Sequence, residues 1–171
     1  TRYFEEYGID ERTLAKVAVK NHKHGSLNPR AHFRQEITIE QALNAPPVAE
    51  PLRLYDCCPT TDGCAAAILT RADLAKKYTN DYVIIKGMGF SVTGGYFSAQ
   101  FDQTFTFTGF RSTQEAARSA YKQAGIAQPM KEIDVVELHD CFTITEIVNY
   151  EDLGFAKKGE GWKLIEEGET Y

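Results

Sequence analysis

The chain has 171 residues, of which 43% are hydrophobic, 12% aromatic and 25% charged. This length and composition fit one ordinary domain with a hydrophobic core and exclude an intrinsically disordered chain. The formal net charge of -5 excludes the basic surface that nucleic-acid-binding proteins carry. Apolar runs stay well below the roughly 20 residues that span a bilayer. We therefore expect neither membrane insertion nor a secretory signal.

The sequence contains four cysteines: Cys57, Cys58, Cys64 and Cys141. Adjacent cysteines seldom form a disulfide with each other because the geometry of that disulfide is strained. None of the four fits a CxxC zinc pattern. We therefore expect reduced thiols in a cytoplasmic protein. Three histidines in the first part of the chain are interpreted as surface residues, and no metal site is expected: His22, His24 and His32.

Residues 1–51 are predicted to form helices and loops without strands. Asp10 is placed to cap a helix that runs to about His22, with Gly25 at its stop. A second, short helix is expected from Ile39 to Asn44, before two prolines.

The next stretch, residues 52–78, mixes short elements. Leu52–Tyr55 is predicted to be extended. Cys64–Thr70 fits a buried strand better than a helix because it is short and apolar. Arg71–Tyr78 is predicted to form a short helix.

Alternating strands and helices are predicted in the second half. Tyr82–Gly87 and Ile133–Leu138 are short and rich in β-branched residues, which favours strands. Capping boxes at Ser112–Glu115 and Thr143–Glu146 open the helices that follow, and Gly125 stops the first of them. This order predicts a parallel α/β sheet, since consecutive βα units close with one hand.

Two segments carry weaker signals. The aromatic residues between Phe97 and Phe110 fit a core better than a ligand site, although Phe105 and Phe107 alternate with threonines as on an exposed edge or a cavity wall. The tail from Gly159 to Tyr171 is predicted to be a polar loop.

His139, Asp140 and Cys141 lie where a predicted strand ends and a helix begins. In open parallel sheets, ligands bind at the carboxyl ends of the strands. The N-termini of the helices that follow supply free N–H groups there. The three side chains are therefore candidates to face a cleft. Two alternatives stay open: a plain turn in which Asp140 only caps the helix, and a nucleophilic Cys with a His base.

Five basic residues cluster in an otherwise acidic chain: Lys16, Lys20, Lys23, Arg30 and Arg34. A phosphate-bearing ligand explains such a cluster, and a solvated helix face explains it equally well. The sequence leaves both interpretations open.

The segment Val136–Phe142, with the sequence VELHDCF, closely resembles thiolases of the sterol-carrier-protein type, especially their archaeal and anaerobic bacterial branch. Other segments resemble the same branch, so that the resemblance covers essentially the whole chain: Val19–Lys23, Leu27–Pro29, Pro51–Gly63 and Thr143–Phe155.

This resemblance implies an acetyl-CoA C-acyltransferase that makes or cleaves a 3-oxoacyl-CoA such as acetoacetyl-CoA, in lipid metabolism. In thiolases one cysteine takes the acyl group as a thioester and a second cysteine moves the α-proton. Two oxyanion holes hold the charge that develops on the thioester oxygens. Coenzyme A thioesters are then the substrates, and no cofactor is implied.

The resemblance also assigns roles to individual residues. It makes His139 a hydrogen-bond donor in the oxyanion hole for the acetyl-CoA enolate. It places Cys141, Phe142 and Cys58 beside the pantetheine arm, so that Cys141 is not the nucleophile. The basic residues near Lys20 become candidates to bind the phosphates of coenzyme A.

The implied fold is part of the layered αβαβα thiolase architecture, with a helical loop domain followed by βαβα units. Residues 1–51 resemble the end of the loop domain, residues 52–80 the last strand of the N-terminal half and a linker, and residues 81–171 the first part of the C-terminal half. The loops that carry the nucleophilic Cys, the Gly-His-Pro motif and the second Cys are not among these residues. We therefore expect a central fragment of a thiolase, inactive by itself.

Two other functions stay open beside the thiolase reaction. One is a retro-aldolase that acts on coenzyme A thioesters together with a small partner protein. The other is a non-catalytic acyl-CoA-binding subunit of a heteromeric complex. The resemblance further implies a homodimer or tetramer, with a zinc-ribbon/OB-fold acyl-CoA protein and HMG-CoA synthase as possible partners.

Overall fold

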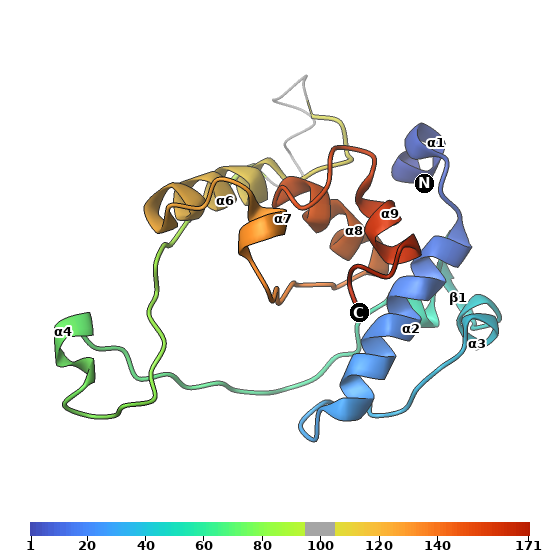
Figure 1. The fold of residues 1–171 in the computed structure, drawn as a ribbon. Helices are drawn as coiled ribbons and strands as arrows, with labels where there is room; N and C mark the ends of the chain where they lie inside the picture. The colour runs from blue at the N-terminus through green and yellow to red at the C-terminus, as the bar shows by residue number, and fades with distance from the viewer. Residues whose placement is uncertain (95–104) are drawn as a thin grey trace.

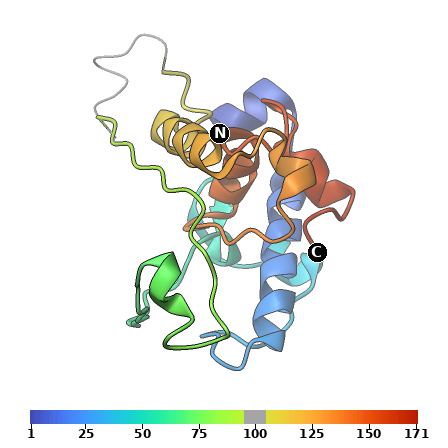
Figure 2. The same cartoon turned by 60° about the vertical axis from the view of Figure 1, so that its left-hand side comes forward.

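The computed structural model describes residues 1–94 and 105–171, and helices are the main regular elements of this part. The long helix α2 (Glu11–Leu27) lies beside α8 (Thr143–Asp152) and α9 (Gly161–Glu166), as Figures 1 and 2 show. The core lies between these helices, where Leu14, Val17 and Ile147 are fully buried. Among the described residues, no helix combines the length and the apolarity needed to cross a membrane.

Helix α2 begins as the sequence predicts. The Asp10 carboxylate accepts hydrogen bonds from the N–H groups of Arg12 at 2.9 Å and Thr13 at 3.3 Å, so that it satisfies two free donors of the first turn. The predicted stop at Gly25 is wrong, because the helix continues to Leu27.

A short helix and a small sheet follow α2. Helix α3 (Ile39–Leu43) is confirmed, with a capping box between Thr38 and Gln41. Strand β1 (Pro47–Ala49) pairs antiparallel with β2 (Leu52–Arg53), so that residues 1–51 are not free of strands as predicted. The 3₁₀-helix η1 (Leu54–Asp56) continues directly from β2.

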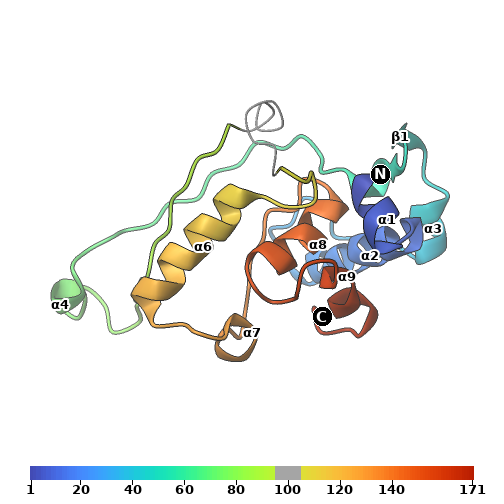
Figure 3. The same ribbon diagram turned by 90° about the horizontal axis from the view of Figure 1, so that it is seen from above.

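Within the described ranges, the remaining short helices are α1 (Arg2–Tyr7), α4 (Ala72–Ala75) and α7 (Pro129–Glu132). Helix α4 is shorter than the predicted helix over residues 71–78. It stands away from the helical body at the end of two extended segments (Figures 1 and 3).

The two predicted capping boxes do not form. Helix α6 (Arg111–Ala124) ends at Gly125 as predicted, but it begins before Ser112 and has no side-chain cap. Helix α8 also lacks a side-chain cap. The Thr143 hydroxyl donates instead to Asp56 at 2.9 Å, and Glu146 pairs with Lys20. At the start of α8, Thr143 and Glu146 therefore contact residues far away in the sequence and do not bond to the first turn of the helix.

In the described part of the chain, no strand hydrogen bonds form at the predicted strands 64–70, 82–87 and 133–138. Val83 is 94% exposed and Val135 79% exposed. A strand needs a neighbouring strand for its N–H and C=O groups, and the described residues bring none beside these segments. The individual strand predictions are therefore wrong for this structure.

Close packing against α6 holds one of these extended segments (Figure 3). A Cβ atom placed on Gly87 would lie 2.2 Å from the Ala120 carbonyl oxygen, and one on Gly89 would lie 1.8 Å from that of Ala116. The amide of Gln123 donates to the Met88 carbonyl at 2.6 Å. The alanine face of α6 therefore packs directly against backbone.

Other weak predictions have mixed outcomes. The predicted polar loop at residues 159–171 is wrong, since it contains α9. Phe107 and Phe110 are largely exposed, so they are not core residues in this structure. Phe97 lies outside the described residues.

Candidate functional site

A cleft of about 350 Å³ opens between α2, the loop after η1 and the turn before α8. Its lining includes residues from these three elements and Phe33 from the loop after α2: Asn21, His22, Phe33, Cys57, Cys58 and Asp140. The predicted pantetheine loop and the HDCF turn therefore meet at one cleft, although they lie far apart in the sequence.

Backbone pairing joins the two segments. Cys57 forms an isolated antiparallel bridge with Phe142, and the Cys58 N–H donates to the Cys141 carbonyl at 3.0 Å. The structure thus brings together the three residues that the resemblance assigned to a pantetheine site, of which Cys58 lines the cleft and Cys141 and Phe142 do not.

His139 lies in the same turn, with an exposed side chain. It does not line the cleft, whereas its neighbour Asp140 does. The amide of Asn149 on α8 donates to the His139 carbonyl at 3.3 Å. The backbone of His139 is therefore fixed from α8 while its imidazole stays accessible.

A buried polar network supports this turn from below. The Asn21 amide Nδ2 lies 2.7 Å from Asp140 Oδ2 and 2.7 Å from Glu146 Oε2. Lys20 Nζ donates to Asn21 Oδ1 at 2.6 Å and pairs with Glu146 Oε1 at 2.7 Å. The Tyr150 hydroxyl donates to the same Glu146 oxygen. Sequence reasoning missed this network, because its partners come from distant segments.

Burial shifts several pKa values in the network. The pKa of Asp140 is raised by its burial and by the nearby Glu146 charge, while Lys20 and the Asn21 hydrogen bond oppose the shift. Burial and Glu146 also raise the pKa of the Tyr150 hydroxyl, which therefore stays a donor.

Asp56, which also lines the cleft, forms a second buried contact. Its carboxylate accepts from the Thr143 hydroxyl at 2.9 Å and from the Arg53 N–H at 2.8 Å. Burial, Asp56 and Cys58 raise the pKa of the neighbouring Cys57 thiol. A raised pKa keeps that thiol protonated and a weak nucleophile.

One member of the basic cluster is buried, and two others form ion pairs. Lys20 is directed into the core, where its side chain is 7% exposed beside Glu146. Lys16 pairs with Glu166, and Lys23 lies 3.7 Å from Glu36. Lys20 is therefore removed from the candidates for phosphate binding.

The histidines near the cleft contact protein groups. His22 Nδ1 lies 2.9 Å from the Gln35 carbonyl oxygen, and His32 Nδ1 lies 2.7 Å from the Thr61 hydroxyl. Over residues 1–94 and 105–171, no group of three or more His, Cys, Asp or Glu side chains is arranged to hold a metal ion.

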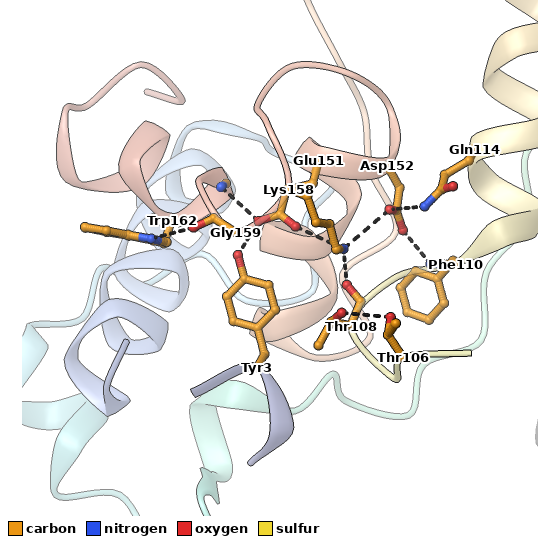
Figure 4. A network of polar contacts seen from close by, with 11 residues as sticks. Tyr3, Thr106, Thr108, Phe110, Gln114, Glu151, Asp152, Lys158, Gly159 and Trp162 are labelled. Carbon is orange, nitrogen blue, oxygen red and sulfur yellow. Dashed lines mark hydrogen bonds and ion pairs between the residues drawn. The ribbon is translucent and has the colours of Figure 1, made fainter. Parts of the chain in front are cut away.

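A second network ties the C-terminal end of α8 to its surroundings (Figure 4). Lys158 Nζ lies 3.0 Å from Glu151 Oε2 and 3.6 Å from Asp152 Oδ1. The Tyr3 hydroxyl donates to Glu151, and the Phe110 N–H donates to Asp152 at 2.5 Å. Lys158 thus forms ion pairs with two buried carboxylates at the end of α8.

Comparison with known proteins identifies the family. The model for the N-terminal domain of thiolase matches residues 1–73, and that for the C-terminal-domain-like part of thiolase matches residues 95–171. The chain belongs to the thiolase family. This confirms the resemblance stated above and the predicted class, a partial α/β thiolase fold.

The relatives are longer than this chain. An acetyl-CoA acetyltransferase from Methanothermobacter thermautotrophicus is 43% identical over 99% of the chain, which covers 43% of that protein. Sterol carrier protein 2 from Oryctolagus cuniculus is 34% identical over 98% of the chain, which covers 30% of that protein. The chain therefore spans less than half the length of either relative.

A solved structure also matches the fold. The Ltp2-ChsH2(DUF35) aldolase superposes with a TM-score of 0.83 and 28% identity over 98% of this chain, which covers 44% of that one. The match therefore includes nearly all residues of this chain but less than half of that one.

Proposed function

We propose that this chain contributes the acetyl-CoA side of a thiolase active site, in a protein that transfers acyl groups between coenzyme A thioesters. The observation that carries this proposal is the backbone pairing of the Cys57–Cys58 loop with Cys141 and Phe142. This junction lies next to a cleft that is lined by Cys58 and by Asp140, the neighbour of His139. In the proposed site Cys58, Cys141 and Phe142 contact the neutral pantetheine arm.

His139 is the proposed donor to the thioester oxygen of acetyl-CoA. Loss of the α-proton places negative charge on that oxygen, and a fixed N–H donor stabilises the developing charge without reorganisation. Helix α8 begins four residues after His139, so that the positive end of its dipole faces the same turn. The proposed nucleophile and proton-moving cysteine lie on other loops.

The natural polypeptide that carries this segment allows a direct test. We expect it to cleave acetoacetyl-CoA when coenzyme A is supplied. His139→Ala should lower the rate of carbon–carbon bond formation about 100-fold or more and leave acyl transfer to the enzyme nearly unchanged. Equal rates of bond formation in both proteins would refute the role of His139.

The likeness to an aldolase favours a second candidate, a retro-aldol cleavage of a 3-hydroxyacyl-CoA. This reaction consumes no free coenzyme A, whereas thiolysis does. Turnover of a 3-hydroxyacyl-CoA without added coenzyme A would therefore favour the aldolase.

A non-catalytic subunit is the third candidate. Its natural polypeptide would have a mass near 19.2 kDa and bind an acyl-CoA without turnover. Mass spectrometry of the purified natural protein separates this case from the other two. Cytoplasmic location, oligomeric state and the named partner proteins stay predictions.

A further inference from the structure

We infer that Asn21 is a positioning residue for the His139 turn, an inference that rests on the proposed function. Asn21 belongs to α2, in the region that matches the N-terminal thiolase domain, and the turn belongs to the C-terminal-domain-like region. One side-chain amide therefore joins the two regions at the His139 turn, in addition to the main-chain contact of Cys58 with Cys141.

The contacts of Asn21 use both ends of its amide. Its nitrogen donates to Asp140 and to Glu146 at 2.7 Å each, and its oxygen accepts from Lys20 at 2.6 Å. The amide is thus held by three charged groups, and its orientation is set by the need to donate to carboxylates and accept from an ammonium.

Those charged groups are themselves anchored. The side chains of Lys20 and Glu146 are 7% and 5% exposed, and their ion pair lies in the protein interior. A buried pair of this kind has few alternative arrangements, because either partner alone is costly to bury. The Asn21 amide is held by this pair, and its hydrogen bond to Asp140 therefore fixes the position of the Asp140 carboxylate.

Asp140 is adjacent to His139, whose carbonyl is held from the other side by Asn149. The peptide that joins His139 to Asp140 is therefore fixed by α2 on one side and α8 on the other. An oxyanion donor works only when its position is set before the charge develops. Loss of the Asn21 contact should shift the imidazole away from the position that catalysis requires.

The test uses Asn21→Leu in the natural polypeptide, with Asn80→Leu as the matched control. Asn80 is exposed, in the stretch after α4. We expect Asn21→Leu to lower kcat for carbon–carbon bond formation about 10- to 100-fold, with a much smaller change in KM for acetyl-CoA and in acyl transfer. Asn80→Leu should change none of these.

A reciprocal exchange provides the rescue. Asn21→Asp alone places a third carboxylate beside Asp140 and Glu146, and should lower kcat. Adding Asp140→Asn restores an amide opposite a carboxylate and should recover part of the lost rate. A residue that acts only on stability would lower the Tm of these variants without a kcat loss and a recovery of this kind.

NMR of histidine-labelled protein supplies a readout that needs no turnover. The imidazole signal of His139, assigned with His139→Gln, should shift or broaden in Asn21→Leu and stay in place in Asn80→Leu. An unchanged signal together with unchanged kcat in a folded Asn21→Leu variant would overturn the inference. A wild-type protein inactive on acyl-CoA thioesters would instead overturn the proposed function.

Discussion

The backbone N–H of Cys58 donates to the carbonyl of Cys141 at 3.0 Å, and this bond joins the two loops of the candidate site. It uses main-chain atoms, so it does not depend on either thiol. The side-chain contact that stabilises the same junction is the bond from Thr143 to Asp56. The geometry of the cleft therefore depends on the bond between this hydroxyl and this carboxylate, and both residues also line the cleft.

Thr143→Val tests that junction. Valine has nearly the shape of threonine but cannot donate, so the buried Asp56 carboxylate loses a partner and keeps the Arg53 N–H. An unmet buried acceptor costs about 1–3 kcal/mol, and we expect urea denaturation to show a loss of this size. The control is Thr145→Val, two residues further along α8 and only half-buried, whose hydroxyl contacts Cys141 Sγ and not Asp56. Equal stability of the two variants would contradict the role of Thr143.

Much of the helical structure was predictable from local chemistry. The Asp10 cap, the short helix at Ile39 and the stop at Gly125 are set by residues within one turn of each helix end. The predicted caps at Ser112 and Thr143 failed, in the second case because the hydroxyl found a distant partner.

Strands and the supporting network were harder to predict. Residues 82–87 have strand-like sequence, but a strand forms only beside another one. The contacts of Asn21 with Asp140 and Glu146 cross more than a hundred residues, and no local spacing reveals them. Family resemblance identified the turn at His139, and only the three-dimensional structure showed what supports it.

Gly89→Ala tests the packing of the extended segment against α6. A Cβ at this position would lie 1.8 Å from the Ala116 carbonyl oxygen, which is backbone and cannot rotate away. The segment must move off the helix, and we expect a loss of about 1–3 kcal/mol in the free energy of unfolding. Gly63→Ala is the control, because no atom lies within 4 Å of its Cβ position. Similar effects of both substitutions would rule out the close contact.

Lys158→Met tests the network at the end of α8. The substitution leaves the carboxylates of Glu151 and Asp152, each with a side chain 1% exposed, without their shared cation. Lys158 itself is 39% exposed, so solvent screens the pair, and we expect a loss of about 2 kcal/mol rather than the larger cost of breaking a wholly buried pair. Lys157→Met, at the exposed neighbouring position, should change the Tm little. A Tm of Lys158→Met that matches this control would show that the network contributes nothing.

Asp140→Asn should change how stability depends on pH. The pKa of Asp140 is raised by burial and by Glu146, against the opposing effects of Lys20 and Asn21. The folded state therefore binds this proton more tightly than the unfolded state does. The resulting stabilisation is complete below the unfolded pKa and is lost as the pH rises through the folded pKa. Asparagine carries no such proton, yet its Oδ1 can still accept from Asn21.

The variant should consequently gain stability relative to wild type as the pH increases. We expect the Tm difference, variant minus wild type, to be more positive at pH 7 than at pH 4. Both proteins should be measured at one ionic strength, since salt screens the charges of Glu146 and Lys20. A Tm difference that stays constant between the two pH values would mean that Asp140 titrates alike in the folded and unfolded chains, and that the buried network does not hold its carboxylate as described.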